Sequence, residues 1–209
     1  MTYNFNLLDK QKIKLGYNER MYRYIVNKVM RYGQGKAFYY FQRGMTLYIK
    51  ENNNKKGLIG CEIGVHRGVN SEVMLKSLPI KKLYCIDPYT DFSEETNNKI
   101  SHKTIHFKNE AVKRLSKYGD KVKFIFKPSE DVYNNFEDNY FNFVYIDGNH
   151  DLIDVDIKNY YPKTKWILGG HDFHSSKLNV VNGVIDFSNK YNFKLFGGRD
   201  GDWWIVKEK

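Results

Sequence analysis

The sequence predicts an α/β fold in which helices cover both faces of a mostly parallel sheet, and three observations predict it. Leu58–Gly68 reads as a buried strand that opens into a glycine turn. A second apolar strand delivers Asp87 about one βαβ unit later. Further along the chain, short apolar segments alternate with helical patterns in the order that a doubly wound sheet requires.

Each element is predicted from an apolar run, helical spacing or the glycine and proline residues that end it. The predicted strands are residues 58–63, 83–86, 122–126, 141–146 and 166–168, with a closing hairpin of 193–196 and 203–206. The predicted helices are residues 71–78, 107–118, 152–161 and 180–189, and the polar residues 91–101 are expected to form a mobile loop near the pocket. Together these elements form one domain, residues 58–209. Trp203 and Trp204 are expected in its core, and Asp154 and Asp156 on a solvated helix face.

Residues 1–57 form a separate, basic segment. They contain twelve Lys or Arg against three Asp or Glu, and eight of the seventeen tyrosines, whereas the remainder carries a net charge of only +1. Helical spacing predicts helices at residues 18–31 and 37–50, so we expect a helical cap on the main domain or a contact within a homo-oligomer. Basic side chains interleaved with tyrosines suit a glycan, another anionic partner or nucleic acid. The alternative is a solvated helical face with its tyrosines packed on the domain.

The cysteine content and the hydropathy exclude several classes of protein. Cys61 and Cys85 each stand just before an acidic residue at a strand end, so we expect buried free thiols rather than a disulfide or metal framework. No apolar run is long enough to cross a bilayer, and the N-terminal residues lack the apolar core of a signal peptide. The expected location is the cytoplasm.

The glycine turn excludes a dinucleotide as the ligand. A dinucleotide fingerprint has three glycines, the second of which lets the backbone approach a pyrophosphate. Counting from Gly64, the second and third positions hold His66 and Val69. The turn therefore suits a ligand without a pyrophosphate, and Asp87 is placed to accept hydrogen bonds from a ribose diol. S-adenosylmethionine fits both conditions.

At these residues the chain resembles the class I S-adenosylmethionine-dependent methyltransferases. Their first motif is an acidic residue, any residue, glycine, three residues and glycine, and Glu62, Gly64 and Gly68 match it. The resemblance implies a Rossmann-like sheet of seven strands with an antiparallel last strand. The cofactor contacts that it implies are Glu62 and Gly64 at the methionine end, Gly68 in the same turn, Asp87 at the ribose, Ser129 and Glu130 at the adenine side, and Asp147 at the acceptor edge. For Ser129, a helix N-cap explains the residue equally well.

Four groups are expected to converge at the carboxyl edge of the predicted sheet. Asp147 ends one strand and is followed by His150, while His171 and Asp172 end a neighbouring strand. Two chemistries are open to them. In one, Asp147 and Asp172, with His171, hold a divalent cation such as Mg²⁺ that activates the acceptor hydroxyl. In the other, no metal binds, and His150 or His171 is the base that removes the acceptor proton.

The motifs DGNH and GGHD narrow the resemblance to small O-methyltransferases that act on catechols and macrolide sugars. In that subgroup, an aspartate after the fourth strand and an acidic pair after the fifth bind metal. Asp147 matches the first of these ligands, and His171 with Asp172 occupies the place of the pair. His171 departs from the pattern, because an imidazole shifts the preference from Mg²⁺ toward Zn, Mn or Fe.

The sequence therefore predicts an S-adenosylmethionine-dependent enzyme that methylates oxygen, with a sugar hydroxyl favoured over a small phenol. An RNA methyltransferase is the first alternative. The basic leader favours it, and the lack of an Asn-Pro-Pro-Tyr type motif for a flipped base disfavours it. A non-catalytic binding module that has kept the fold is the second alternative, and four acids at one sheet edge argue against it.

Overall fold

The computed structural model describes residues 42–90, 102–174, 176–198 and 201–207. The chain divides into two units, and the second of them begins at Arg43. The predicted helix at residues 18–31, the start of the predicted helix at 37–50 and the predicted loop at 91–101 lie outside the described residues. The sheet and the candidate site both belong to the unit that begins at Arg43.

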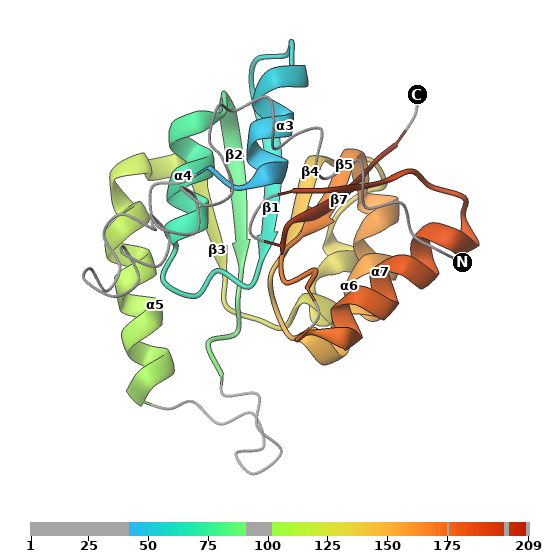
Figure 1. The fold of residues 1–209 in the computed structure, drawn as a ribbon. Helices are drawn as coiled ribbons and strands as arrows, with labels where there is room; N and C mark the ends of the chain where they lie inside the picture. Colours follow the sequence, from blue (N-terminus) through green and yellow to red (C-terminus); the bar gives the residue numbers. More distant parts are fainter. Residues whose placement is uncertain (1–41, 91–101, 175, 199–200, 208–209) are drawn as a thin grey trace, which may run out of the picture. The chain divides into compact units, whose positions relative to one another are not determined.

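A seven-stranded sheet forms the centre of this unit (Figure 1). Its strands are β1 (Leu58–Ile63), β2 (Ile80–Ile86), β3 (Val122–Ile125), β4 (Phe141–Ile146), β5 (Thr164–Gly170), β6 (Leu195–Gly197) and β7 (Trp203–Val206). They lie in the order β3-β2-β1-β4-β5-β7-β6, with β7 antiparallel to both neighbours and the other pairs parallel. The predicted Rossmann-like, seven-stranded fold is therefore confirmed. Because the strand order reverses between β1 and β4, their carboxyl ends flank the crevice where open α/β sheets bind ligands.

Helices cover both faces of the sheet (Figure 1). On one face, the core includes residues of α3 (Gly44–Asn52), α4 (Val69–Ser77) and α5 (His102–Leu115). On the other face, it includes residues of α6 (Ile153–Lys163) and α7 (Leu178–Lys190). The predicted core positions of Trp203 and Trp204 are confirmed, since each is 1% exposed. Cys61 and Cys85 are buried free thiols as predicted, one in each core.

The bounds of several elements differ from the predicted ones, and for three of them a local reason explains the difference. α5 begins at His102 rather than at residue 107, because its buried face includes the polar Thr104, which an apolar pattern does not register. α6 continues through Pro162, since a proline in the last turn removes only one donor before the chain leaves the helix. β5 is longer at both ends than predicted because its first residue pairs with β4 and its last with β7.

The basic leader contributes one described helix, α3, to the unit of the sheet. Met45 and Ile49 of α3 are buried in the core beneath it. The predicted boundary between cap and main domain at residue 57 stays a prediction. Among the described residues, no helix combines the length and apolar character needed to span a membrane.

Glu72 of α4 pairs with three cations, and one of them, Arg114, lies on α5. Its side chain is 8% exposed and pairs with Lys76 and Arg114 at 3.0 Å each and also with Lys117. Burial alone would raise the pKa of Glu72, but the hydrogen bonds from Lys117, Lys76 and Arg114 outweigh it and lower the pKa to about 2. The carboxylate is therefore ionised across the physiological range.

We expect Glu72→Gln to lower the free energy of unfolding at pH 7 by about 1–2 kcal/mol, discounted because solvent screens the exposed lysines. The folded-state pKa lies below the unfolded value, so the contribution is full above about pH 4.5 and is lost as the pH falls toward 2. Denaturant titrations of the wild type and the variant at pH 7 and pH 4 measure this loss of unfolding free energy and its dependence on pH. The exposed Glu137→Gln is the control, and an equal loss for both variants would contradict the role of the network.

Candidate active site

β1 ends in a glycine turn that brings it against the end of β4. Gly64 has a φ of 83°, a left-handed conformation that glycine adopts without strain. A Cβ at Gly64 would lie 2.1 Å from the carbonyl oxygen of Asp147, so another residue would push the strand ends apart. The N–H of Asp147 donates to the carbonyl of Ile63 at 2.7 Å and fixes this approach. Gly68 completes the turn as the N-cap of α4, with a φ of 70°.

Asp87, which follows β2, closes the same turn. Its Oδ2 accepts hydrogen bonds from the backbone N–H groups of Val65 and His66, at 2.9 and 2.8 Å. Its Oδ1 accepts one from the N–H of Tyr89 at 2.8 Å. Burial raises the pKa of Asp87, and the three backbone hydrogen bonds oppose that rise. Oδ1 keeps a lone pair for a further donor, so a ribose hydroxyl stays the predicted partner.

Glu62 is buried in β1 and is held by the first turn of α4. Nδ2 of Asn70 donates to its Oε1 at 2.8 Å, and Oγ of Ser71 donates to its Oε2. Burial raises the pKa of Glu62 to about 7, although both hydrogen bonds oppose the rise. The Oδ1 of Asn70 is buried without a hydrogen-bond partner among the described residues. The predicted methionine end of the site thus contains a buried acceptor that none of the described residues engages.

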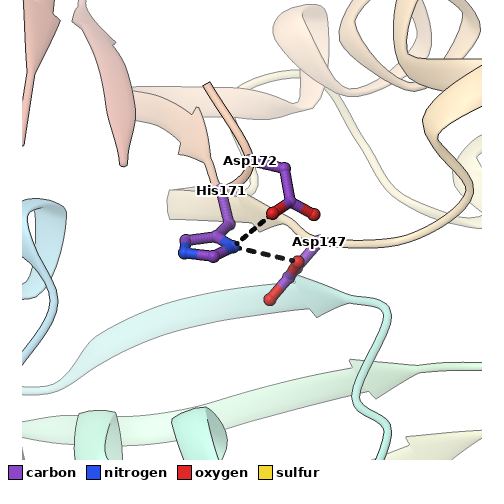
Figure 2. A group of neighbouring side chains, drawn as sticks. All are labelled: Asp147, His171 and Asp172. Carbon is purple, nitrogen blue, oxygen red and sulfur yellow. Dashed lines mark ion pairs between the residues drawn. The ribbon is translucent and has the colours of Figure 1, made fainter. Parts of the chain in front are cut away.

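The ends of β4 and β5 bring Asp147, His171 and Asp172 together (Figure 2). Nδ1 of His171 lies 3.1 Å from Oδ1 of Asp172 and 3.7 Å from Oδ1 of Asp147. One ligand atom from each residue lies within 4.8 Å of the others, a spacing open to a metal ion. Asp172 has a φ of 61°, which breaks the alternation of a strand and lets two successive side chains reach the same site.

The groups of this cluster shift the pKa values of Asp172 and His171 in opposite directions. The hydrogen bond from His171 holds the pKa of Asp172 well below its usual range, with further contributions from His150 and His174. Burial lowers the pKa of His171, but its hydrogen bond with Asp172 and the charge of Asp147 outweigh burial, and the pKa is raised.

His150 has both ring nitrogens engaged, which bears on its predicted role as a base. Nζ of Lys177 lies 3.2 Å from Nδ1, and because an ammonium can only donate, Nδ1 is the acceptor. The proton then sits on Nε2, which lies 2.6 Å from Oδ2 of Asp172 and donates to it. This arrangement orients Asp172 and leaves His150 no lone pair for an acceptor proton. His171 is therefore the stronger candidate for the base.

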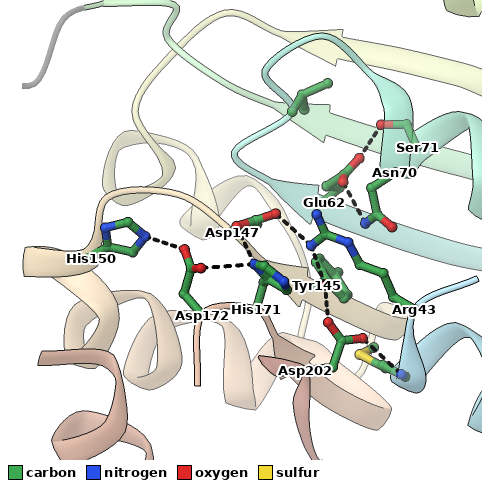
Figure 3. Close-up of polar contacts among 12 residues, drawn as sticks. Arg43, Glu62, Asn70, Ser71, Tyr145, Asp147, His150, His171, Asp172 and Asp202 are labelled. Carbon is green, nitrogen blue, oxygen red and sulfur yellow. Dashed lines mark hydrogen bonds and ion pairs between the residues drawn. The ribbon is translucent and has the colours of Figure 1, made fainter. Parts of the chain in front are cut away.

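Sequence reasoning missed three residues that hold Asp147 in place (Figure 3). Nη1 of Arg43 donates to Oδ2 of Asp147 at 2.8 Å and to the hydroxyl of Tyr145 at 2.6 Å. That hydroxyl donates to Oδ1 of Asp202 at 2.7 Å, and Oδ2 of Asp202 accepts from the N–H of Met45 at 3.0 Å. Burial raises the pKa of Asp147, and that of Asp202 to about 6, while the charge of Arg43 opposes both rises. No local pattern marks Arg43 among the twelve basic residues of the leader.

The residues predicted at the adenine side lie in a short turn after β3. Oγ of Ser129 does not cap this turn but donates to Oδ1 of Asp156 at 2.5 Å, while Glu130 is exposed. The prediction that Asp156 covers a solvated helix face is wrong, because α6 packs beneath this turn and leaves Asp156 only 2% exposed. Burial raises the pKa of Asp156 to about 7. Asp154 is exposed, as predicted.

The strand order, the glycine turn and the acidic edge together define a doubly wound α/β fold of the kind that binds ligands at the carboxyl ends of its strands. A family model described as a methyltransferase domain matches residues 61–166. The chain belongs to this family and is an S-adenosylmethionine-dependent methyltransferase. No curated protein matches the sequence closely enough to count as a relative.

Solved structures share the fold at low sequence identity. A protein from Corynebacterium glutamicum has a TM-score of 0.61 and 12% identity, over 90% of this chain and 97% of that chain. The O-methyltransferase TomG from Streptomyces achromogenes, solved with S-adenosylmethionine, has a TM-score of 0.54 and 15% identity over 78% of each chain. A protein from Pyrococcus horikoshii, provisionally described as an RNA methyltransferase, has a TM-score of 0.51 and 12% identity, over 78% and 80%. The shared fold therefore does not discriminate between acceptors.

Proposed function

We propose that this methyltransferase transfers the methyl group to a hydroxyl oxygen of a sugar or another small acceptor, and that Asp147, His171 and Asp172 bind a divalent cation beside that oxygen. The observation that carries the proposal is the convergence of these three groups within 4.8 Å, next to the turn at Gly64. A donor in the crevice and an oxygen at this cluster are then neighbours, and such positioning can supply about 7–11 kcal/mol.

The donor set of the cluster suits a divalent cation. Oδ2 of Asp147 is engaged with Arg43, but its Oδ1 lies on the side of His171. With Oδ1 of Asp172 and Nδ1 of His171, this gives two carboxylate oxygens and one imidazole nitrogen. Such a set accepts Mg²⁺ and favours Mn²⁺ or Zn²⁺ more than an all-oxygen set does. When bound there, a divalent cation lowers the pKa of the acceptor hydroxyl and fixes its orientation.

The tautomer of His171 separates cation binding from general-base catalysis. To bind a cation with the two aspartates, Nδ1 must present its lone pair, and the proton must sit on Nε2. To act as the base, Nδ1–H must donate to Asp172, and Nε2 then receives the acceptor proton as the methyl group is transferred. The 3.1 Å contact between His171 and Asp172 supports this second arrangement wherever no cation is bound.

The choice of a small acceptor rests on the resemblance at Asp147 and at the His171–Asp172 pair. Residues 1–41 of the basic leader, which favours RNA, lie outside the described residues. An RNA acceptor would show an affinity for RNA that falls steeply with salt concentration, because counterions are released from the phosphates. Methyl transfer from labelled donor to glycosides, catechols and RNA, each at low and moderate salt, distinguishes the two acceptor classes.

A cation-binding experiment tests the site without a known acceptor. We expect the protein loaded with S-adenosylhomocysteine to bind Mn²⁺, measured as the loss of the free-ion signal in electron paramagnetic resonance. Asp172→Asn is expected to weaken this binding at least about tenfold, because it removes a charged ligand. The exposed Asp154→Asn is the control.

Each outcome of this experiment has a distinct meaning. If S-adenosylhomocysteine binds but Mn²⁺ does not, the cation proposal fails, and His171 as the base becomes the better account. If calorimetry shows no heat with either S-adenosylhomocysteine or S-adenosylmethionine, the chain is a binding module that has kept the fold.

A further inference from the structure

Arg43 lies between the two halves of the candidate site, and its role does not follow from the motifs. In Figure 3 its guanidinium lies between Glu62 and Asn70 on one side and Asp147 and His171 on the other. Its charge acts on Glu62 as well as on Asp147, which agrees with this placement. It therefore stands where the methionine end of the donor meets the acceptor edge.

Within the described part of the chain, only one of the donor nitrogens of Arg43 has a hydrogen-bond partner. Nη1 makes both of its hydrogen bonds, to Tyr145 and to Asp147. Among the described residues, neither Nε nor Nη2 has a hydrogen-bond partner. The side chain is 27% exposed, so these free donors are not sealed in the core. Because Nη1 is held in place, Nε and Nη2 can donate two parallel hydrogen bonds to a carboxylate.

A second, independent group on the same side complements an amino-acid ligand. Asn70 is only 8% exposed, and its Oδ1 has no partner among the described residues. Its Nδ2 is committed to Glu62, which fixes the amide orientation and leaves Oδ1 as an acceptor. An unpaired buried acceptor costs free energy that a ligand donor can recover. The donors of Arg43 can bind a carboxylate, and the acceptor of Asn70 can bind an ammonium group. An amino-acid ligand carries both of these groups on one carbon.

We propose that Arg43 binds the α-carboxylate of the methionine moiety of S-adenosylmethionine, with Oδ1 of Asn70 accepting a hydrogen bond from its ammonium group. Tyr145 and Asp202 position Arg43, because the hydroxyl of Tyr145 accepts from Nη1 while it donates to the buried Asp202. The inference deepens the proposed function and rests on the donor occupying the crevice beside Gly64. Because Arg43 also bonds Asp147, donor binding and the acceptor edge share one side chain.

Paired ligands test the inference through binding rather than activity. Calorimetry is carried out with S-adenosylhomocysteine and with its decarboxylated analogue, which keeps the adenosine, the thioether and the amine. We expect the wild type to bind S-adenosylhomocysteine about 10–100-fold more tightly than the analogue, and Arg43→Gln to lose most of this preference. The affinity of Arg43→Gln for the analogue should stay within about threefold of the wild-type value. Arg43→Lys should restore part of the preference, because it keeps the charge but not the planar fork.

Two further variants keep the result interpretable. Lys50→Gln removes the same charge from an exposed position of α3 and should leave both affinities unchanged. Tyr145→Phe should reduce the preference less than Arg43→Gln does. It removes only the hydroxyl that orients Nη1 and leaves the guanidinium in place. The inference is overturned if Arg43→Gln retains the wild-type preference, or if it weakens both ligands equally. Failure of the wild type to bind S-adenosylhomocysteine at all would instead refute the donor assignment.

Discussion

His171→Gln is expected to lower the rate of methyl transfer by about 10²–10⁴-fold at saturating donor and acceptor, the range measured for a positioned acid–base group. The side chain contacts Asp147 and Asp172 through Nδ1 and follows β5, so it belongs to neither the glycine turn nor the predicted donor contacts. We therefore expect the affinity for S-adenosylhomocysteine to change by less than about threefold. Single-turnover rates and calorimetry measure the two quantities.

The same variant distinguishes the two chemistries proposed for the cluster. If His171 is a ligand, a high Mn²⁺ concentration should partly restore the rate, because the two carboxylates remain. If His171 is the base, added imidazole should restore it instead, and the wild-type rate should rise with pH through the raised pKa of His171 as the neutral form accumulates. His106→Gln, at a side chain 65% exposed, is the control. An unchanged rate in His171→Gln would remove this residue from both mechanisms.

Gly64→Ala is expected to destabilise the protein by about 2–4 kcal/mol and to reduce affinity for S-adenosylhomocysteine at least about 100-fold. The new Cβ would lie 2.1 Å from the carbonyl oxygen, 2.4 Å from the carbonyl carbon of Asp147 and 2.6 Å from the nitrogen of Gly148. All three are backbone atoms, so no side chain can move aside. The ends of β1 and β4 must separate, and the donor crevice lies between them.

Gly57→Ala is the matched control for Gly64→Ala. Gly57 has a similar φ of 78°, but its nearest neighbours to an added Cβ are side-chain atoms of Lys81 at 3.7 and 3.9 Å. It should show only the cost of a left-handed conformation, about 1–2 kcal/mol, and bind S-adenosylhomocysteine normally. Denaturant titrations and calorimetry compare the two. Equal losses in both variants would show that the close approach of the strands is not required.

Most of the fold follows from the sequence because its signals are local. The bounds of β1 and β4 agree with the predicted residues 58–63 and 141–146. An apolar run bounded by turn residues indicates that a segment is buried, whichever elements pack against it in the folded protein. The count of seven strands and the antiparallel last strand came from the resemblance at Glu62, Gly64 and Gly68, and the sheet confirms both.

The candidate site was predicted as a set of residues but not as a network. Asp147, His171 and Asp172 do meet, because parallel strands end at the same edge of a sheet. The engagement of both nitrogens of His150 depends on Lys177 and on the path of the chain after β5. Sequence spacing contains no information on such a contact, so the two histidines were equal candidates for the base.

By itself, the sequence determined the doubly wound sheet, the glycine turn after β1 and the acids that face its edge, since periodicity and turn chemistry act within a few residues. Only the tertiary structure decided that Arg43 bonds Asp147 across 104 positions, that Tyr145 bonds Asp202, and that Asp156 is buried. Each of these depends on which surfaces meet after the chain has folded. A lone charged residue in a helix or leader looks the same in sequence whether solvent or another charge faces it.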